Sequence, residues 1–216
     1  MEKSVIITLP DHDIETTYVS KWSEAITTEG KRCGLKVVQL ISKRASRDVI
    51  EGIVASKGID LFIVNGHGDE DAIYGYGDKA LIDGRNISKF KGIIYTIACE
   101  AAKSLGKAAV SKNTKCFIGY TEKFVIIYDH TKTVTPLKDE LSRPFFDSTN
   151  RIPLSIMKGN SCAESVERAR KAYDEWIVKV RSLVIDEHLP EQEWLLRALI
   201  WDSVSLKLLG NGDSTI

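Results

Sequence analysis

The sequence predicts an α/β protein in which helices cover a largely parallel sheet. Short apolar runs typical of buried strands alternate along the chain with stretches that have helical periodicity. The 216 residues are enough for one well-packed domain, and we find no internal repeat, low-complexity tract or linker. We therefore expect residues 1–216 to form a single domain.

The strand candidates are apolar runs bounded by turn residues. In chain order they lie at residues 4–10, 34–41, 60–64, 92–98, 115–120 and 204–209. Between the third and the fourth run, residues 69–83 alternate in polarity and contain glycine turns, a pattern typical of a small hairpin. A main sheet of about six strands follows from this reading.

The helix candidates fill the intervals between these runs. They lie at residues 14–29, 46–58, 99–112, 160–180 and from 191 up to the last strand. Residues 160–180 give the clearest signal, because Ser161 and Glu164 form a capping box before an apolar stripe. Residues 131–160 contain prolines and no clear periodicity, so we expect a mobile surface segment there. Three tryptophans are expected at core positions: Trp176, Trp194 and Trp201.

Charge and composition exclude several classes of function. Lys plus Arg and Asp plus Glu each total 30, so a formal charge of zero gives no electrostatic case for binding nucleic acid or an anionic membrane. No apolar run approaches the ~20 residues of a membrane-spanning helix. The first residues lack the apolar region of a signal peptide, which predicts a cytoplasmic protein.

The cysteines and acidic loops do not suggest a metal site. The four cysteines lack CxxC spacing and suit free thiols in a reducing compartment: Cys33, Cys99, Cys116 and Cys162. The acidic stretches 10–13 and 69–71 are interpreted as solvated loop charges rather than metal ligands. We expect no metal and no cofactor.

Two reactive side chains follow neighbouring strand candidates. His67 stands between two glycines after the third strand, and Cys99 comes directly after the fourth. In open parallel sheets, working groups lie beyond the carboxyl ends of the strands. If the two strands are neighbours, the imidazole can accept the thiol proton and make the sulfur a nucleophile. The pair predicts a Cys–His catalytic dyad.

The surroundings of both residues fit this chemistry. The backbone amides of Gly68 and Cys99 are candidate donors to an oxyanion. Cys99 is also expected to begin a helix, where the helix dipole favours thiolate over thiol.

An apolar run ending in His-Gly, followed by an apolar run ending in Ala-Cys, resembles the caspase-like cysteine peptidases (clan CD). "LFIVNGHGD" and "IIYTIACEAAKSLG" carry the resemblance, and "LIWDSVSLKLLGNGD" is similar to the closing strand of CHAT and gingipain domains. It implies a three-layer α/β/α sandwich and a cysteine endopeptidase of protein or peptide substrates that works through a thioester. By analogy, a regulatory protein partner in a prokaryotic defence or signalling system is expected.

Two other classes of function remain open. The chain could be a binding or scaffold module that keeps the dyad without using it. It could also be another thiol hydrolase such as a glutamine amidotransferase, although that class sets its cysteine between glycines and "IACEA" has none.

The resemblance also directs attention to substrate preference. In this fold the loops after the first and fifth strands line the pocket for the residue before the scissile bond, and in caspases both loops supply arginines. Here those loops carry Asp11, Asp13 and Glu122 and no arginine. Carboxylates would pair with a basic side chain, which predicts cleavage after Arg or Lys.

Overall fold

A six-stranded sheet forms the centre of the computed structural model, which describes residues 2–187 and 190–216. From one edge to the other the strands are β2 (Lys36–Ile41), β1 (Ser4–Leu9), β3 (Leu61–Val64), β6 (Ile93–Thr96), β7 (Cys116–Tyr120) and β8 (Leu206–Gly210). The first five are parallel, and β8 runs antiparallel to β7. A separate two-stranded hairpin pairs β4 (Ala72–Tyr74) with β5 (Ala80–Asp83). The predicted sheet and hairpin are both confirmed.

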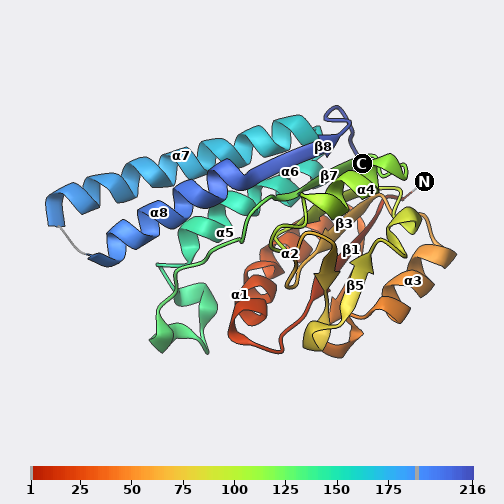
Figure 1. Ribbon diagram of the computed structural model, residues 1–216, viewed down its shortest axis with the longest axis horizontal. Helices are drawn as coiled ribbons and strands as arrows, with labels where there is room; N and C mark the ends of the chain where they lie inside the picture. Colours follow the sequence, from red (N-terminus) through yellow and green to blue (C-terminus); the bar gives the residue numbers. More distant parts are fainter. Residues whose placement is uncertain (1, 188–189) are drawn as a thin grey trace.

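Helices lie on both faces of the sheet (Figure 1). In chain order they are α1 (Ile14–Trp22), α2 (Glu24–Arg32), α3 (Arg47–Ser56), α4 (Ser104–Ser111), α5 (Arg143–Thr149), α6 (Arg151–Met157), α7 (Cys162–Glu187) and α8 (Pro190–Ser205). One face packs against α1, α2, α5, α6 and α7, and the other packs against α3, α4 and the hairpin. The three-layer α/β/α arrangement is therefore the observed one.

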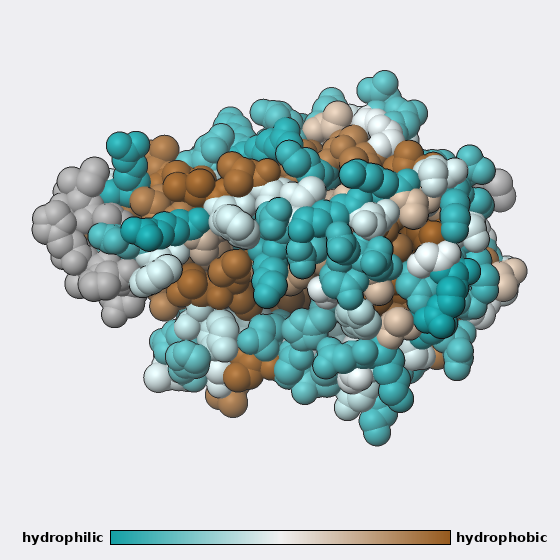
Figure 2. Space-filling view, in the orientation of Figure 1, coloured by the Kyte–Doolittle hydropathy of each residue, from teal (hydrophilic) through white to brown (hydrophobic). Residues whose placement is uncertain are grey.

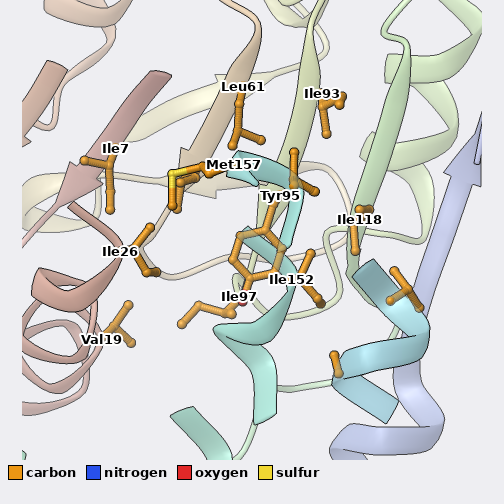
Figure 3. Close-up of a cluster of buried hydrophobic side chains, with 14 of the residues drawn as sticks. Ile7, Val19, Ile26, Leu61, Ile93, Tyr95, Ile97, Ile118, Ile152 and Met157 are labelled. Carbon is orange, nitrogen blue, oxygen red and sulfur yellow. The ribbon is translucent and has the colours of Figure 1, made fainter. Parts of the chain in front are cut away.

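Alternation along each strand divides the core between the two faces. Val5, Ile7 and Leu9 of β1 belong to one apolar cluster, and Ile6 belongs to the other. Every residue of β1 is buried, as expected for a strand covered on both sides. Figure 3 shows the first cluster, in which side chains from four neighbouring strands face helices α2 and α6.

The segment 131–160 differs from its expected irregular form, because it contains α5 and α6. Pro144 lies in the first turn of α5, where its missing N–H removes no helical hydrogen bond. Phe146 and Ile152 are buried against the sheet and Phe145 is buried against α7 and α8, so tertiary packing orders the segment. The sequence pattern did not predict these helices, because each is too short for its apolar residues to show a clear helical period.

Helices α7 and α8 form a pair that extends beyond the end of the sheet (Figure 1). The expected capping box at Ser161 and Glu164 is present, with the Glu164 amide 3.2 Å from the Ser161 hydroxyl. Trp194 and Trp201 are 63% and 44% exposed, so their expected core positions were wrong. Apolar surface is visible along this part of the molecule in Figure 2. Within the described residues, no helix combines the length and the apolar character needed to cross a membrane.

Candidate active site

Side-chain hydrogen bonds extend the sheet beyond the ends of β3 and β6. The hydroxyl of Thr8, at the end of β1, donates to the Asn65 carbonyl at 2.7 Å and accepts from the Asn65 amide at 2.7 Å. On the other side, the Thr96 hydroxyl donates to the Val64 carbonyl at 2.7 Å. These buried contacts fix the backbone from which the next residues, Gly66 and Ala98, emerge.

Glycine is required immediately before and after His67. Gly66 has a φ of +150°, and a Cβ there would lie 1.9 Å from the Tyr74 carbonyl oxygen. A Cβ on Gly68 would lie 2.7 Å from the Ala98 Cβ and 2.9 Å from the Cys99 carbonyl oxygen. The two glycines therefore let the His67 loop pass close to both the hairpin and the Cys99 backbone.

Cys99 lies in a tight turn and not at the start of a helix, which corrects the expectation from sequence. Instead of beginning a helix, the Glu100 amide donates to the Glu122 carbonyl just after β7, and the Ala102 amide donates to the Tyr120 carbonyl at its end, both at 3.0 Å. Glu100 adopts the left-handed region with a φ of +57°, and α4 begins only at Ser104. A helix dipole therefore cannot be invoked to favour the thiolate.

Burial raises the pKa of the Cys99 thiol, and the backbone amide of Phe124 opposes this effect only in part. The resting thiol is consequently protonated at neutral pH. A base must take the proton before the sulfur can attack a substrate.

His67 and Cys99 line the same pocket, with a cavity volume of about 140 Å³. The other lining residues come from α1, from the loop after β3, from the end of β6 and from the extended segment after β7: Glu15, Thr16, Val19, Gly66, Ile97, Phe124 and Ile126. The two side chains that the sequence paired are therefore brought to one concave surface, which is mostly apolar.

The His67 ring contacts Asp13, the residue that precedes α1. His67 Nε2 lies 2.6 Å from a carboxylate oxygen of Asp13. Asp13 also accepts a hydrogen bond from the Thr16 amide at 2.7 Å and so caps α1. Burial raises the pKa of Asp13, but the Thr16 amide and the His67 ring outweigh burial and the pKa is lowered overall. An ionised Asp13 therefore faces the ring.

Both candidate oxyanion donors lie next to the pocket. Within the described chain, the amides of Gly68 and Cys99 donate no backbone hydrogen bond, although Gly68 takes part in an isolated bridge with Ile73. That bridge uses the Asp69 and Tyr74 amides, which donate to Ala72 and His67. The Gly68 amide thus stays available despite its place beside the hairpin.

The three acidic residues expected to bind substrate do not line this pocket. Asp11 lines a different hollow beside Thr17 and Lys21. Asp13 is engaged with His67, and Glu122 is partly exposed and 3.8 Å from Lys103. The acidic residue that does line the pocket is Glu15, in the first turn of α1.

Sequence reasoning missed the roles of Asp13 and Glu15 in this geometry. The local signal at Asp13 was only that of a helix cap, because an Asp three residues before a Thr in a helical stretch predicts capping. Its contact with His67 spans 54 residues of sequence and depends on the pairing of β1 with β3, which brings the ends of the two strands together.

Sequence comparison identifies no relative: neither a protein-family model nor a curated protein matches the chain. Among solved structures, the protein is similar to gingipain R, described as an Arg-specific cysteine proteinase, with a TM-score of 0.57 and 12% identity. The alignment covers 100% of this chain and 47% of the gingipain chain, so the protein spans about half of that structure.

A secreted C11 cysteine protease from Bacteroides thetaiotaomicron, "iotapain", aligns over 56% of this chain and 53% of its own at 12% identity, with a TM-score of 0.42. The similarity to gingipain R agrees with the strand order and layers described above. The protein therefore has the caspase-like fold.

Proposed function

We propose that the protein is a cysteine endopeptidase with Cys99 as nucleophile and His67 as general base. The observation that carries this proposal is the joint placement of both side chains in one pocket, with His67 held by Asp13. Because Nε2 faces the Asp13 carboxylate, Nε2 carries the ring proton and Nδ1 is left to accept another.

The reaction uses these groups in sequence. His67 Nδ1 takes the thiol proton while the Cys99 sulfur attacks the peptide carbonyl carbon. The amides of Gly68 and Cys99 donate to the oxyanion that forms. Cleavage of the C–N bond then transfers the proton from His67 to the departing amine and leaves a thioester. Water hydrolyses the thioester, with His67 again acting as base.

Activity on a panel of fluorogenic peptides tests this proposal. The wild type should release product, and Cys99→Ala and His67→Ala should each reduce turnover to background while the melting temperature changes little. Cys33→Ala is the matched control, because Cys33 is a partly exposed thiol outside the pocket. A Cys99→Ala variant with full activity would disprove the assignment, and a folded but inactive wild type would favour the scaffold alternative.

We further propose that the enzyme cleaves after Arg or Lys, and that Glu15 selects the basic side chain. Glu15 is exposed, lines the pocket, and has no ion-pair partner among the residues described. Its carboxylate is thus free to meet a cation that enters the mostly apolar pocket beside Cys99. This proposal transfers to Glu15 the role that the sequence suggested for Asp11, Asp13 and Glu122.

Peptides that differ only in the residue before the scissile bond test the preference. Glu15→Gln should lower kcat/KM for the arginyl peptide about tenfold or more, since hydrogen bonds to charged groups contribute about 1.5–3 kcal/mol. Asp11→Asn and Glu122→Gln are matched controls and should leave the preference unchanged. Faster cleavage of the aspartyl peptide than of the arginyl peptide would rule out an acidic pocket.

A further inference from the structure

Four side chains with metal-ligating atoms meet beside the catalytic pocket. They come from three segments: His12 and Asp13 after β1, His67 after β3, and Asp78 in the β4–β5 hairpin. One ligand atom from each lies within 4.8 Å of every other. Two of the four residues, His12 and Asp78, have no part in the reaction proposed above.

The distances approach those of a zinc site. Tetrahedral Zn²⁺ with bonds of about 2.0–2.1 Å to N and O ligands holds those atoms about 3.3 Å apart. His12 Nε2 lies 3.4 Å from Asp13 Oδ2 and 3.2 Å from Asp78 Oδ1. His67 Nε2 and Asp13 Oδ2 are closer, at 2.6 Å, because they form a hydrogen bond. Asp78 is 67% exposed, so its side chain can adjust.

The orientation of His12 supports the same reading. Its side chain is only 11% exposed and its ring stacks edge-on with His67 and Tyr76. In the described part of the chain, His12 Nδ1 is buried without a hydrogen-bond partner. The polar contacts of the ring are therefore made by Nε2, the atom that faces the cluster.

We infer that His12, Asp13, His67 and Asp78 form an inhibitory binding site for Zn²⁺. Two imidazoles and two carboxylates suit zinc by ligand type and number, and the two aspartates balance the charge of the ion. Calcium, which takes six to eight oxygen ligands, does not fit this set.

Inhibition follows from which nitrogen of His67 the metal occupies, and this step rests on the proposed function. With zinc on Nε2, the neutral ring keeps one proton, which moves from Nε2 to Nδ1. Nδ1 then cannot accept the Cys99 thiol proton, and Asp13 bonds the metal instead of the ring. While zinc is bound, His67 therefore cannot act as general base, and removal of the metal restores its ability to do so.

Binding is measured first, on the Cys99→Ala variant titrated with zinc chloride by calorimetry or by competition with a chromogenic chelator. One equivalent of zinc should bind, and either His12→Ala or Asp78→Asn should weaken binding about tenfold or more. His130→Ala and Asp71→Asn, two exposed residues outside the cluster, should bind like the parent. If Cys99→Ala takes up no zinc, or the two ligand variants bind as tightly as the parent, the site does not exist. This readout needs no peptidase activity, so it stands apart from a failure of the proposed function.

Inhibition is then measured on the active chain. Zinc should abolish peptide cleavage reversibly, with recovery on addition of EDTA, whereas calcium at the same concentration should have no effect. His12→Ala and Asp78→Asn should keep basal activity and require about tenfold more zinc for half-inhibition. Equal sensitivity of these variants and the wild type would place the inhibitory zinc elsewhere, for example on Cys99, and would overturn the inference.

Discussion

At the scale of single residues, Asp13 combines two structural roles in one carboxylate. It caps α1 through the Thr16 amide, and it faces His67 Nε2. The cap requires only a hydrogen-bond acceptor, whereas in the proposed mechanism the negative charge stabilises the imidazolium that forms when His67 takes the thiol proton. The two roles can therefore be separated by substitution.

We expect Asp13→Asn to reduce kcat by up to about 10²–10⁴-fold, the usual contribution of general acid–base catalysis. Its stability should be close to that of the wild type, because Asn is as good an N-cap as Asp. Asp13→Ala should lose activity and also about 1 kcal/mol of unfolding free energy. Steady-state kinetics and urea denaturation measure the two effects. Full turnover in Asp13→Asn would show that the carboxylate is dispensable.

The four thiols differ in burial, which predicts a labelling pattern. Cys116 and Cys162 are fully buried and contact each other, while Cys33 and Cys99 are partly accessible. Iodoacetamide should modify only Cys33 and Cys99 in the native protein, and all four cysteines in denaturant. Peptide mass mapping gives the sites. Native labelling of Cys116 would contradict the packing described here.

At the scale of elements, α8 holds the segment after β7 that forms one wall of the pocket. The Val125 amide donates to Asp202 Oδ1 at 3.0 Å, and the Trp201 indole donates to the Lys123 carbonyl at 2.9 Å. Phe124 and Ile126 then line the pocket, and Val125 and Ile127 pack against the cluster between α5, α7 and α8. The position of α8 thus shapes the pocket although α8 contributes none of the residues that line it.

Asp202 makes this contact pH-dependent. Burial raises the pKa of its carboxyl well above the ordinary range, and the Val125 amide opposes burial only in part. The folded state therefore holds a proton that the unfolded state releases above a pKa of about 3.9. Stability that is present below this value is lost as pH rises toward the higher folded pKa.

Asp202→Asn should flatten this pH dependence, since the amide oxygen still accepts from Val125 and nothing ionises. We expect the variant to match the wild type near pH 4 and to exceed its melting temperature near pH 8. Thermal unfolding across this range, with the exposed Asp213→Asn as control, measures the difference. Parallel curves for wild type and Asp202→Asn would refute the account.

At the scale of the whole molecule, a buried hydrogen-bond network joins the sheet to its helical layer. The hydroxyls of Tyr95 (β6) and Tyr120 (β7) each lie 2.6 Å from the Thr149 hydroxyl of α5. Tyr120 also lies 3.0 Å from the Tyr173 hydroxyl of α7. All four residues are fully buried, so their hydroxyls need partners within the protein, and the Tyr95 hydroxyl also lies 3.0 Å from the Thr149 carbonyl oxygen.

Replacing Thr149 with Val removes the shared hydroxyl at nearly constant shape. We expect a loss of about 1–3 kcal/mol of unfolding free energy, because buried polar groups lose a partner. Thr149→Ser keeps the hydroxyl and should be the less damaging change, although it deletes a methyl group. Urea denaturation of both variants decides the matter, and a Val variant at least as stable as the Ser variant would contradict the network's role.

From the sequence alone we could predict the main sheet, most of the helices that flank it, and the positions of His67 and Cys99 after neighbouring strands. This was possible because the signals are local: apolar runs bounded by glycines mark strands, and working groups follow strand ends in parallel sheets. The capping box at Ser161 and the hairpin at residues 69–83 were equally readable for the same reason.

The residues that surround His67 and Cys99 could be identified only from the tertiary structure. The order β2-β1-β3-β6-β7-β8 brings the loop after β1 beside His67, and the hairpin adds Asp78. Such contacts join residues that are far apart in the chain, and local pattern carries no information about which loops meet. The turn at Cys99 could not be predicted for the same reason, because the amides of Glu100 and Ala102 donate to the distant carbonyls of Glu122 and Tyr120 and do not start a helix. Burial in that turn, and not a helix dipole, sets the state of the thiol.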